Sequence, residues 1–278
     1  AAAPEAAPAE EDDGTVKPLA LVKTLAGLGY AGAHDGDALK RARFSDPCGV
    51  VVDANKNVFV TDCGSHTVRC ISAEGEVTTV AGCGKPGYAD GKGNQAALSY
   101  PYALALGPDG TIYVADSGNH RIRKITAPAD NRAGAEVATV AGTGAPGHRD
   151  GAAHTAQFLY PTGIAADSDG TLFVADRGNH RIRKITPKGT VTTLAGSGLN
   201  GALDGKGAQA AFAWPNAVCI DPTTKNAIFV VDTFVFQLRR VTRDGVTRTL
   251  CIGPKPKPKP KPEAPAAAIW LALRRRRR

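Results

Sequence analysis

Methionine is absent from all 278 residues, including position 1. We therefore expect the chain to be a processed form or a fragment of a longer product, and its start shows no signal peptide. Long apolar runs are also lacking, because the longest fall far short of the ~18 residues that a membrane-spanning helix needs. The sequence therefore predicts no transmembrane segment.

Signatures of common enzyme classes are missing as well. The chain has no phosphate-binding loop, no Gly-x-Ser-x-Gly nucleophile turn, no His-Glu-x-x-His zinc motif and no dinucleotide fingerprint. No stretch sustains a helical apolar period over ten residues, which excludes a solenoid of helix pairs. The 32 glycines and 19 prolines favour a turn-rich, mostly β protein.

The net charge of +8 is concentrated at the chain ends. Residues 1–16 are rich in Ala, Pro and acid, whereas residues 253–278 alternate Pro with Lys and finish in five arginines. Neither end can bury enough apolar surface to offset its ordering entropy. We predict disordered tails at 1–16 and 253–278 around a folded domain at 17–252, whose mild positive charge is common in domains without a nucleic-acid partner.

The domain contains four copies of one pattern. An aspartate that ends the second apolar run recurs 54 to 60 residues apart, at Asp62, Asp116, Asp176 and Asp232. Each copy holds four short runs rich in Val, Ile and Thr, which in the third copy lie at 163–167, 171–176, 180–185 and 190–196. The short turns between them force antiparallel neighbours. Four such strands repeated about an axis predict an all-β fold, a β-propeller of four-stranded antiparallel blades.

Two copies carry nearly identical strings, VADSGNHRIRKI at 114–125 and VADRGNHRIRKI at 174–185. With the Pro-x-Gly before the second string and the VTTLAG after it, these strings resemble NHL repeats, and the resemblance covers about residues 20–252. The first copy departs slightly (CGSHTVRCI) and the fourth strongly (TFVFQLRRV). The resemblance implies a ring of about six blades and binding of proteins or, in some members, single-stranded RNA.

The number of strands does not fit a simple closed ring. One lone strand, Val22 to Gly27, precedes the four copies and matches the strand that ends each of them. The last copy already has its own final strand at 246–250, so the leading strand is surplus. We therefore favour an open or incomplete ring over a tight four-bladed ring, and we expect self-association through an open propeller edge.

Equivalent positions in the repeats suggest construction rather than chemistry. His66, His120 and His180 occupy the same turn in three copies, which favours a turn-bracing role over a zinc site. The four aspartates that end the second runs should accept backbone N–H groups of the following turn. A second set, Asp35, Asp90, Asp150 and Asp204, precedes glycines that suit a turn with positive φ. We predict no catalytic residue, no metal site and no cofactor.

Basic and aromatic residues should share one face, formed by the turns after the second strands and the connections between repeats. The candidate interaction residues are Asn119, His120, Arg121, Arg149, Asn179, His180, Arg181, Phe234 and Phe236. A protein partner of unknown identity is the main expectation. Single-stranded RNA is an alternative, because arginines attract phosphates and aromatic rings stack on bases.

A lyase or hydrolase with a metal at the propeller axis is a second alternative. The innermost strands begin with Cys48-Gly49, Tyr102-Ala103, Thr162-Gly163 and Asn216-Ala217, which include no carboxylate or histidine. This argues against an enzyme.

Six cysteines fit no zinc motif. The turn after Asp53 should place Cys48 opposite Cys63 on neighbouring strands, so these two residues could form a disulfide in an oxidising compartment. Free thiols are the default expectation.

Overall fold

The computed structural model describes residues 22–126 and 134–250. The tails predicted at 1–16 and 253–278 lie outside the described residues. The described chain is built of β-strands and single 3-10 turns. Within those two ranges, no helix is long and apolar enough to cross a membrane.

Each repeat forms one antiparallel sheet, called blade 1 to blade 4 in chain order. Blade 1 has β1 (Gly36–Asp37), β2 (Pro47–Val52), β3 (Val58–Asp62), β4 (Thr67–Ile71) and β5 (Glu76–Ala81). Blade 2 has β6 (Gly91–Lys92), β7 (Pro101–Leu106), β8 (Ile112–Asp116), β9 (Arg121–Thr126) and β10 (Glu136–Ala141). Blade 3 has β11 (Gly151–Ala152), β12 (Pro161–Ala166), β13 (Leu172–Asp176), β14 (Arg181–Ile185) and β15 (Thr190–Ala195). Blade 4 has β16 (Gly205–Lys206), β17 (Pro215–Ile220), β18 (Ala227–Asp232), β19 (Gln237–Thr242) and β20 (Val246–Leu250).

The predicted all-β propeller fold is confirmed, and the predicted strands of blade 3 agree with β12 to β15 within two residues. The sequence missed a fifth strand in each sheet. Its two residues come from the connection before the blade and pair with the blade's last long strand, as β1 pairs with β5. The strand order is therefore β1-β5-β4-β3-β2 in blade 1 and equivalent in the others.

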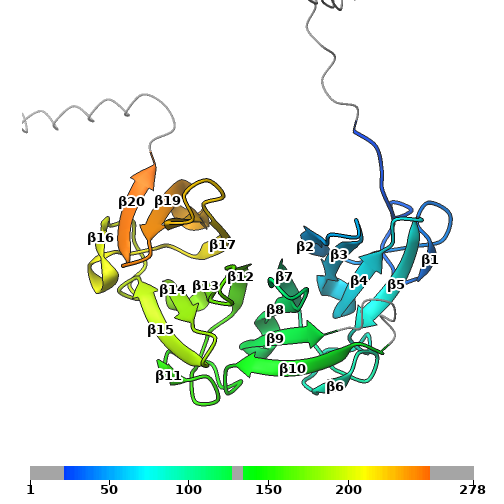
Figure 1. Cartoon of the computed structure of the whole chain (residues 1–278), viewed down its shortest axis with the longest axis horizontal. Helices are drawn as coiled ribbons and strands as arrows, with labels where there is room; N and C mark the ends of the chain where they lie inside the picture. The colour runs from blue at the N-terminus through cyan, green and yellow to red at the C-terminus, as the bar shows by residue number, and fades with distance from the viewer. Residues whose placement is uncertain (1–21, 127–133, 251–278) are drawn as a thin grey trace, which may run out of the picture.

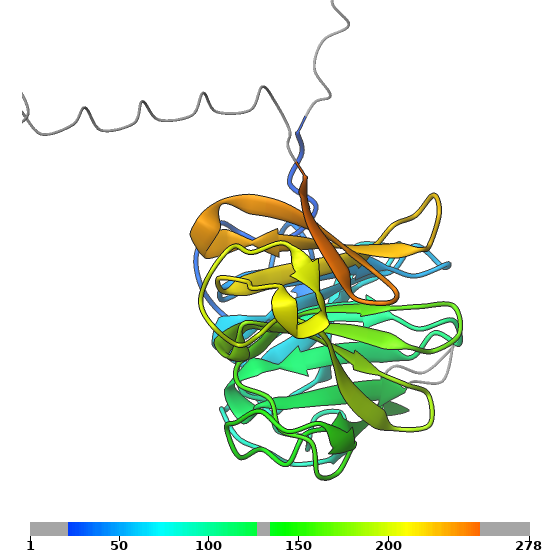
Figure 2. The same ribbon diagram turned by 90° about the vertical axis from the view of Figure 1, so that its left-hand side faces the viewer.

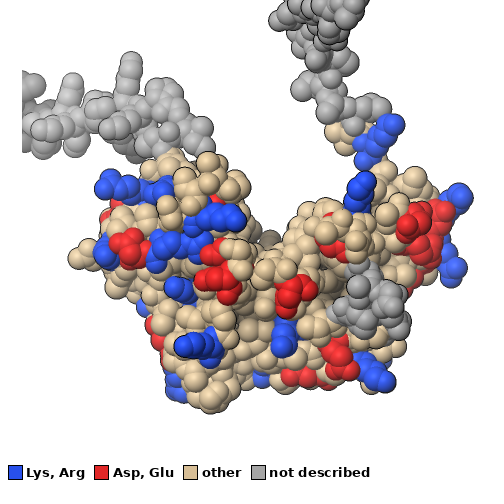
Figure 3. All heavy atoms as spheres, viewed as in Figure 1, with Lys and Arg blue, Asp and Glu red and all other residues tan. Residues whose placement is uncertain are grey.

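The four blades form an arc, and blade 1 and blade 4 face each other across an open gap (Figure 1). The two ends of the described chain flank this gap at the same end of the molecule (Figures 1 and 2). The space-filling view shows the same notch between the two end blades (Figure 3). The innermost strands pack side by side, and a Cβ on Gly163 would lie only 2.8 Å from the Cα of Ala217 in the next blade. The arc agrees with the predicted open ring, and the alternative of a tight four-bladed ring is wrong.

Apolar side chains hold neighbouring blades together. Phe173 and Ile182 of blade 3 pack against Ile228 and Val230 of blade 4 and are fully buried. At the gap the corresponding surfaces are open to solvent. Val231 of blade 4 is 44% exposed, and Val50 of blade 1 is 63% exposed. The arc therefore ends in two uncovered blade surfaces.

Candidate functional site

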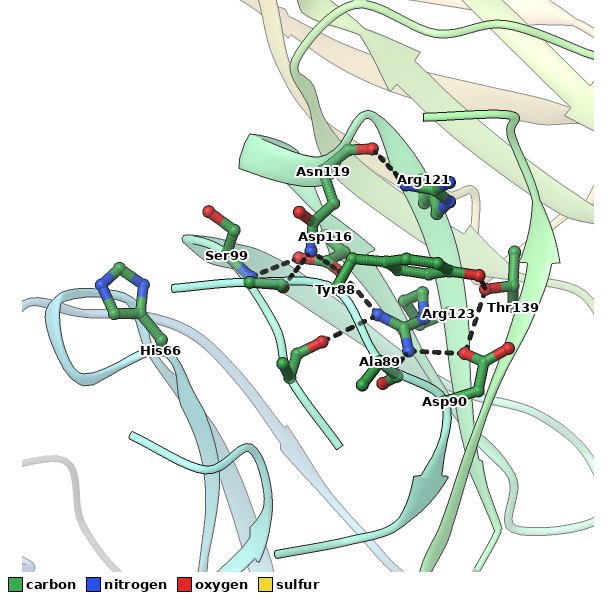
Figure 4. Close-up of polar contacts among 12 residues, drawn as sticks. His66, Tyr88, Ala89, Asp90, Ser99, Asp116, Asn119, Arg121, Arg123 and Thr139 are labelled. Atoms are coloured by element: carbon green, nitrogen blue, oxygen red, sulfur yellow. Dashed lines mark hydrogen bonds and ion pairs between the residues drawn. The ribbon is translucent and has the colours of Figure 1, made fainter. Parts of the chain in front are cut away.

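A buried arginine lies at the centre of every blade. Arg69, Arg123, Arg183 and Arg239 start from the third long strand and have no solvent-exposed side-chain surface. In blade 2, the Nη1 of Arg123 donates to Asp116 at 2.8 Å and to the Ala97 carbonyl, and its Nη2 donates to Asp90 at 2.6 Å (Figure 4). The same pattern holds in the other three blades. These arginines join each sheet to the connection that precedes it.

The aspartates of the second strands are buried structural residues, but one expected detail is wrong. Asp116 accepts the backbone N–H of Ser99, which lies 17 residues before it, and from the following turn it accepts the side-chain amide of Asn119 in place of the expected backbone N–H. Asp62, Asp176 and Asp232 bond in the same way to Ser45, Leu159 and Ala213. A buried carboxylate without partners would cost free energy. The backbone N–H and the arginine provide those partners.

The second set of aspartates does more than form turns. Gly36, Gly91 and Gly151 have the expected positive φ, whereas Gly205 does not. The preceding carboxylates bind the outer side of the buried arginines and remain about half exposed. Burial alone would raise the pKa of Asp150, but the backbone N–H of Thr193 and the guanidinium of Arg183 together lower it. The ionised carboxylate is thus the bound form.

The three repeated histidines were expected to brace their own turn, and the structure shows that they connect one blade to the next. The backbone N–H of Tyr100 donates to Nδ1 of His66 at 3.1 Å, and the two rings meet edge to face. His120 with Tyr160 and His180 with Trp214 repeat this contact. Because Nδ1 accepts a hydrogen bond in each pair, the brace needs a neutral imidazole.

These braces predict that stability falls on acidification. Burial lowers the pKa of His66, His120 and His180 below the ordinary value. Their stabilisation is therefore complete above about pH 6.5, the ordinary histidine pKa of the unfolded chain, and is lost as the pH falls from there through the lower pKa of the folded protein. Thermal unfolding between about pH 7.5 and about pH 5.5 should show a falling Tm. Replacing all three by Gln should flatten this dependence, and an equally steep curve in that variant would contradict the prediction.

The turn of blade 4 differs from the other three in its side chains but not in its backbone. Phe236 has the same left-handed backbone as His120 and His180, with φ of 56°. No further blade follows within the described residues, and its ring is 94% exposed. Phe234, which replaces the glycine at 118 and 178, is 67% exposed. Together with Arg177, Trp214 and Thr233, the two rings line an open apolar hollow.

The other predicted interaction residues are engaged within the fold to different degrees. Asn119 and Asn179 donate to the aspartate of their own blade and to a carbonyl of the preceding connection. Arg121 lies over the ring of Tyr88 at 3.6 Å and donates to the Thr143 carbonyl. Arg181 donates to the Ser197 carbonyl, whereas Arg149 lies in the exposed connection before blade 3. Phe234 and Phe236 therefore present the largest apolar surface of the predicted set.

Cys48 and Cys63 are both free thiols in the structure. A bulge between Pro47 and Val50 shifts the register, so they are not directly opposed as expected. Burial first, and then the nearby Cys48 thiol, raise the pKa of the Cys63 thiol. A disulfide between them stays a prediction.

Near the propeller axis, threonine hydroxyls of β3 and β12 bond to the innermost strand of the next blade. The Thr61 hydroxyl donates to the Tyr102 carbonyl of the next blade, and Thr162 donates to that of Asn216. Within residues 22–126 and 134–250, no group of three or more His, Cys, Asp and Glu is placed to hold a metal ion.

Sequence reasoning missed the buried arginines as ion-pair partners. The signal was present, because an arginine follows each second-strand aspartate by seven residues in all four repeats, as Asp62 precedes Arg69. This constant spacing crosses the turn and places both side chains on one face of two paired strands, where a charge pair can be buried.

Comparisons with known proteins agree with this architecture. The NHL repeat family matches residues 44–71, 98–125 and 158–185. NHL repeat-containing protein 2 of Gallus gallus is 30% identical over 257 residues, which cover 82% of this chain and 35% of that protein. Protein SUPPRESSOR OF QUENCHING 1, chloroplastic, of Arabidopsis thaliana is 31% identical over 59% of this chain and 16% of its own length. The chain therefore spans about a third or less of these relatives.

A catalytically inactive variant of virginiamycin B lyase from Staphylococcus aureus, solved with quinupristin, shares the fold. Its TM-score is 0.51 at 17% identity, over 79% of this chain and 60% of the lyase. Identity this low shows a common propeller architecture alone.

Proposed function

The chain is a β-propeller of NHL repeats, and we propose that it works as a non-enzymatic platform that binds a partner protein through the turn of blade 4. The surface that carries this proposal, called the aromatic turn, consists of Arg177, Trp214, Thr233, Phe234 and Phe236. Exposure of the two phenylalanine rings is the single observation on which it rests.

The aromatic turn has the features of a protein-binding surface. Aromatic and arginine side chains dominate the energetics of protein interfaces. Here Arg177 lies over the ring of Trp214 at 4.7 Å, and the hollow beside them has a largely apolar lining. Two largely exposed phenylalanine rings are costly to leave in water and add little to packing within blade 4. Burial against a partner would recover that free energy.

The equivalent turn of blade 3 has a glycine, Gly178, where blade 4 has Phe234. Gly178 must lack a side chain because a Cβ would lie 2.5 Å from the side chain of Leu159. In blade 4 the equivalent contact residue is the smaller Ala213, whose carbonyl accepts the N–H of Phe234. The backbone turn thus tolerates a large residue only in blade 4.

Removing the two rings should abolish partner binding without unfolding the propeller. We expect Phe234→Ser/Phe236→Ser to lose the proteins that the wild-type chain captures from an extract of its source cells. Direct titration of each purified partner should show at least about 30-fold weaker binding, as for central aromatic contacts. The Tm should change little because neither ring is buried.

A matched control is Leu199→Ser/Leu203→Ser, which removes two other exposed apolar side chains outside the aromatic turn. This variant should bind as the wild type does. Equal binding by the phenylalanine variant would contradict the proposal. Salt-dependent binding of single-stranded RNA without any captured protein would replace it with the RNA alternative.

A further inference from the structure

The aromatic turn carries a positive charge that the fold itself does not use. Arg177 directly follows β13, and its guanidinium carbon lies 4.7 Å from the centre of the Trp214 ring. Its Nε is buried and has no hydrogen-bond partner. In the described part of the chain, the guanidinium forms no ion pair and donates no hydrogen bond. Arg177 is therefore held against an indole ring while its donors stay free.

Other arginines of these turns already have acceptors inside the fold. Arg181 donates to the carbonyls of Asn179 and Ser197. Arg121 of blade 2 donates to the two equivalent carbonyls. Both side chains are thus engaged by their own blade and the connection that follows it. Arg177 differs from them because its contact is the face of an aromatic ring.

The aspartates beside the aromatic turn do not balance the charge of Arg177. Asp176 directly precedes it, but this carboxylate is fully buried and lies 2.7 Å from Arg183. Asp232, which precedes the turn of blade 4, is buried in the same way at 3.0 Å from Arg239. Each carboxylate is paired with the arginine of its own blade. The aromatic turn therefore keeps a positive charge to which an outside carboxylate can bind.

Comparison of the four repeats shows that charge and aromatic rings were exchanged at one place. Trp214 stands where blades 2 and 3 have a tyrosine, and the turn of blade 4 has two phenylalanines in place of a glycine and a histidine. All these side chains line one hollow of about 610 Å³, together with Arg177. The residues equivalent to Arg177 in the other blades are uncharged: Cys63, Ser117 and Thr233. The combination favours a ligand with an apolar group and an anionic group close together.

A carboxylate fits this hollow better than a phosphate does. Proteins that recognise phosphate groups on peptides use clusters of arginines. Among the described residues that line the hollow, Arg177 alone carries a charge. The hydroxyl of Thr233 is already used, because it donates to the Trp214 carbonyl at 2.7 Å. One guanidinium presents a planar fork that matches the two oxygens of a single carboxylate.

We propose that the partner segment bound by the aromatic turn presents an Asp or Glu beside a large apolar residue. The carboxylate pairs with Arg177, and the apolar side chain packs against the rings of Trp214 and Phe236. The 4.7 Å between the guanidinium and the indole centre corresponds to one to two residues of an extended chain, which rises about 3.3 Å per residue. The acid thus lies one or two positions from the apolar residue. This inference rests on the proposed protein-binding role of the aromatic turn and adds the chemistry of its partner.

Selection of short random peptides displayed on phage, with the full chain as the target, tests this chemistry. Peptides that bind the wild type should be enriched at least about 3-fold in Asp or Glu within two positions of a large apolar residue. Arg177→Glu should reverse this preference and enrich Lys or Arg at the same spacing. The matched control Arg41→Glu reverses an exposed arginine in the connection before blade 1 and should select acidic peptides as the wild type does.

A double-mutant cycle with one selected peptide measures the ion pair directly. Replacing the acid of the peptide with the corresponding amide should weaken binding to the wild type by about 5-fold. The same replacement should cost less than about 2-fold against Arg177→Leu, because the partner of the acid is already gone. Leu keeps an apolar side chain beside Trp214, and an unchanged Tm shows that the variant is folded.

The outcomes separate this inference from the proposed function. Peptides that need Phe234 and Phe236 but show no preference for acids overturn the inference and leave the protein-binding role in place. An equal loss for the amide peptide against the wild type and Arg177→Leu does the same. Selected peptides that all bind Phe234→Ser/Phe236→Ser as tightly as the wild type contradict the proposed function, and the inference falls with it.

Discussion

Replacing Asp176 with Ala should lower the free energy of unfolding by about 3–5 kcal/mol, because it leaves the buried Arg183 without its inner carboxylate. Both side chains are fully buried and lie 2.7 Å apart. The substitution also removes the acceptor for the backbone N–H of Leu159. Urea unfolding followed by tryptophan fluorescence would measure the loss.

The outer carboxylate provides a matched control. Asp150→Ala removes the other ion pair of Arg183, but that carboxylate is 44% exposed and water can replace it. We expect a loss of about 1 kcal/mol. The double variant Asp176→Leu/Arg183→Met should recover part of the loss, because no buried charge remains. Equal losses for Asp176→Ala and Asp150→Ala would contradict the assignment of the inner pair as the dominant one.

Replacing Gly82 with Val should also destabilise the arc, by on the order of 2–5 kcal/mol. This glycine has φ of 99°, and a Cβ would lie within 2.3 Å of the His66 carbonyl oxygen. A side chain must therefore push blade 1 away from the connection to blade 2. The expected result is a lower midpoint in urea and faster hydrogen exchange in β4 and β5.

Gly84→Ala separates steric contact from backbone strain. Gly84 has φ of 80°, but nothing lies within 4 Å of its Cβ position. This control should cost only about 1 kcal/mol, the usual penalty for a left-handed backbone at a residue other than glycine. A similar loss at Gly82 would show that the close approach to His66 is unimportant.

The fold could be predicted from the sequence because its signals are local and repeated. The turn at Ser168-Asp169-Gly170, the apolar run of β13 and the alternation of β14 are readable within one repeat, and four copies reinforce each other. The two-residue strand β11 could not be predicted, since Gly151-Ala152 has no apolar pattern of its own. It pairs with β15 only because the connection before blade 3 passes that edge.

The candidate site was less accessible to sequence reasoning. His120 was expected to brace a turn, and its neighbour Tyr160 is 40 residues away, so the partner depends on how blades meet. Exposure of Phe236 is likewise a property of the arc, because where another blade follows the same position is buried at His66 and His120 and half-buried at His180. Cys48 shows that a prediction within a single hairpin can also fail. One bulge shifts the register of β2, so Cys48 does not lie directly opposite Cys63.

The outer edges of the blades leave few free backbone groups with which an added β-strand could pair. Sheet edges with free N–H and C=O groups promote aggregation. Here β1 covers the start of β5, and the carboxylate of Asp35 accepts the N–H of Thr79 further along the same edge. Asp150 does the same for Thr193 on β15. The carboxylates that hold the buried arginines thus also protect the rim, which directs any strand-to-strand association away from the outer edges of the blades.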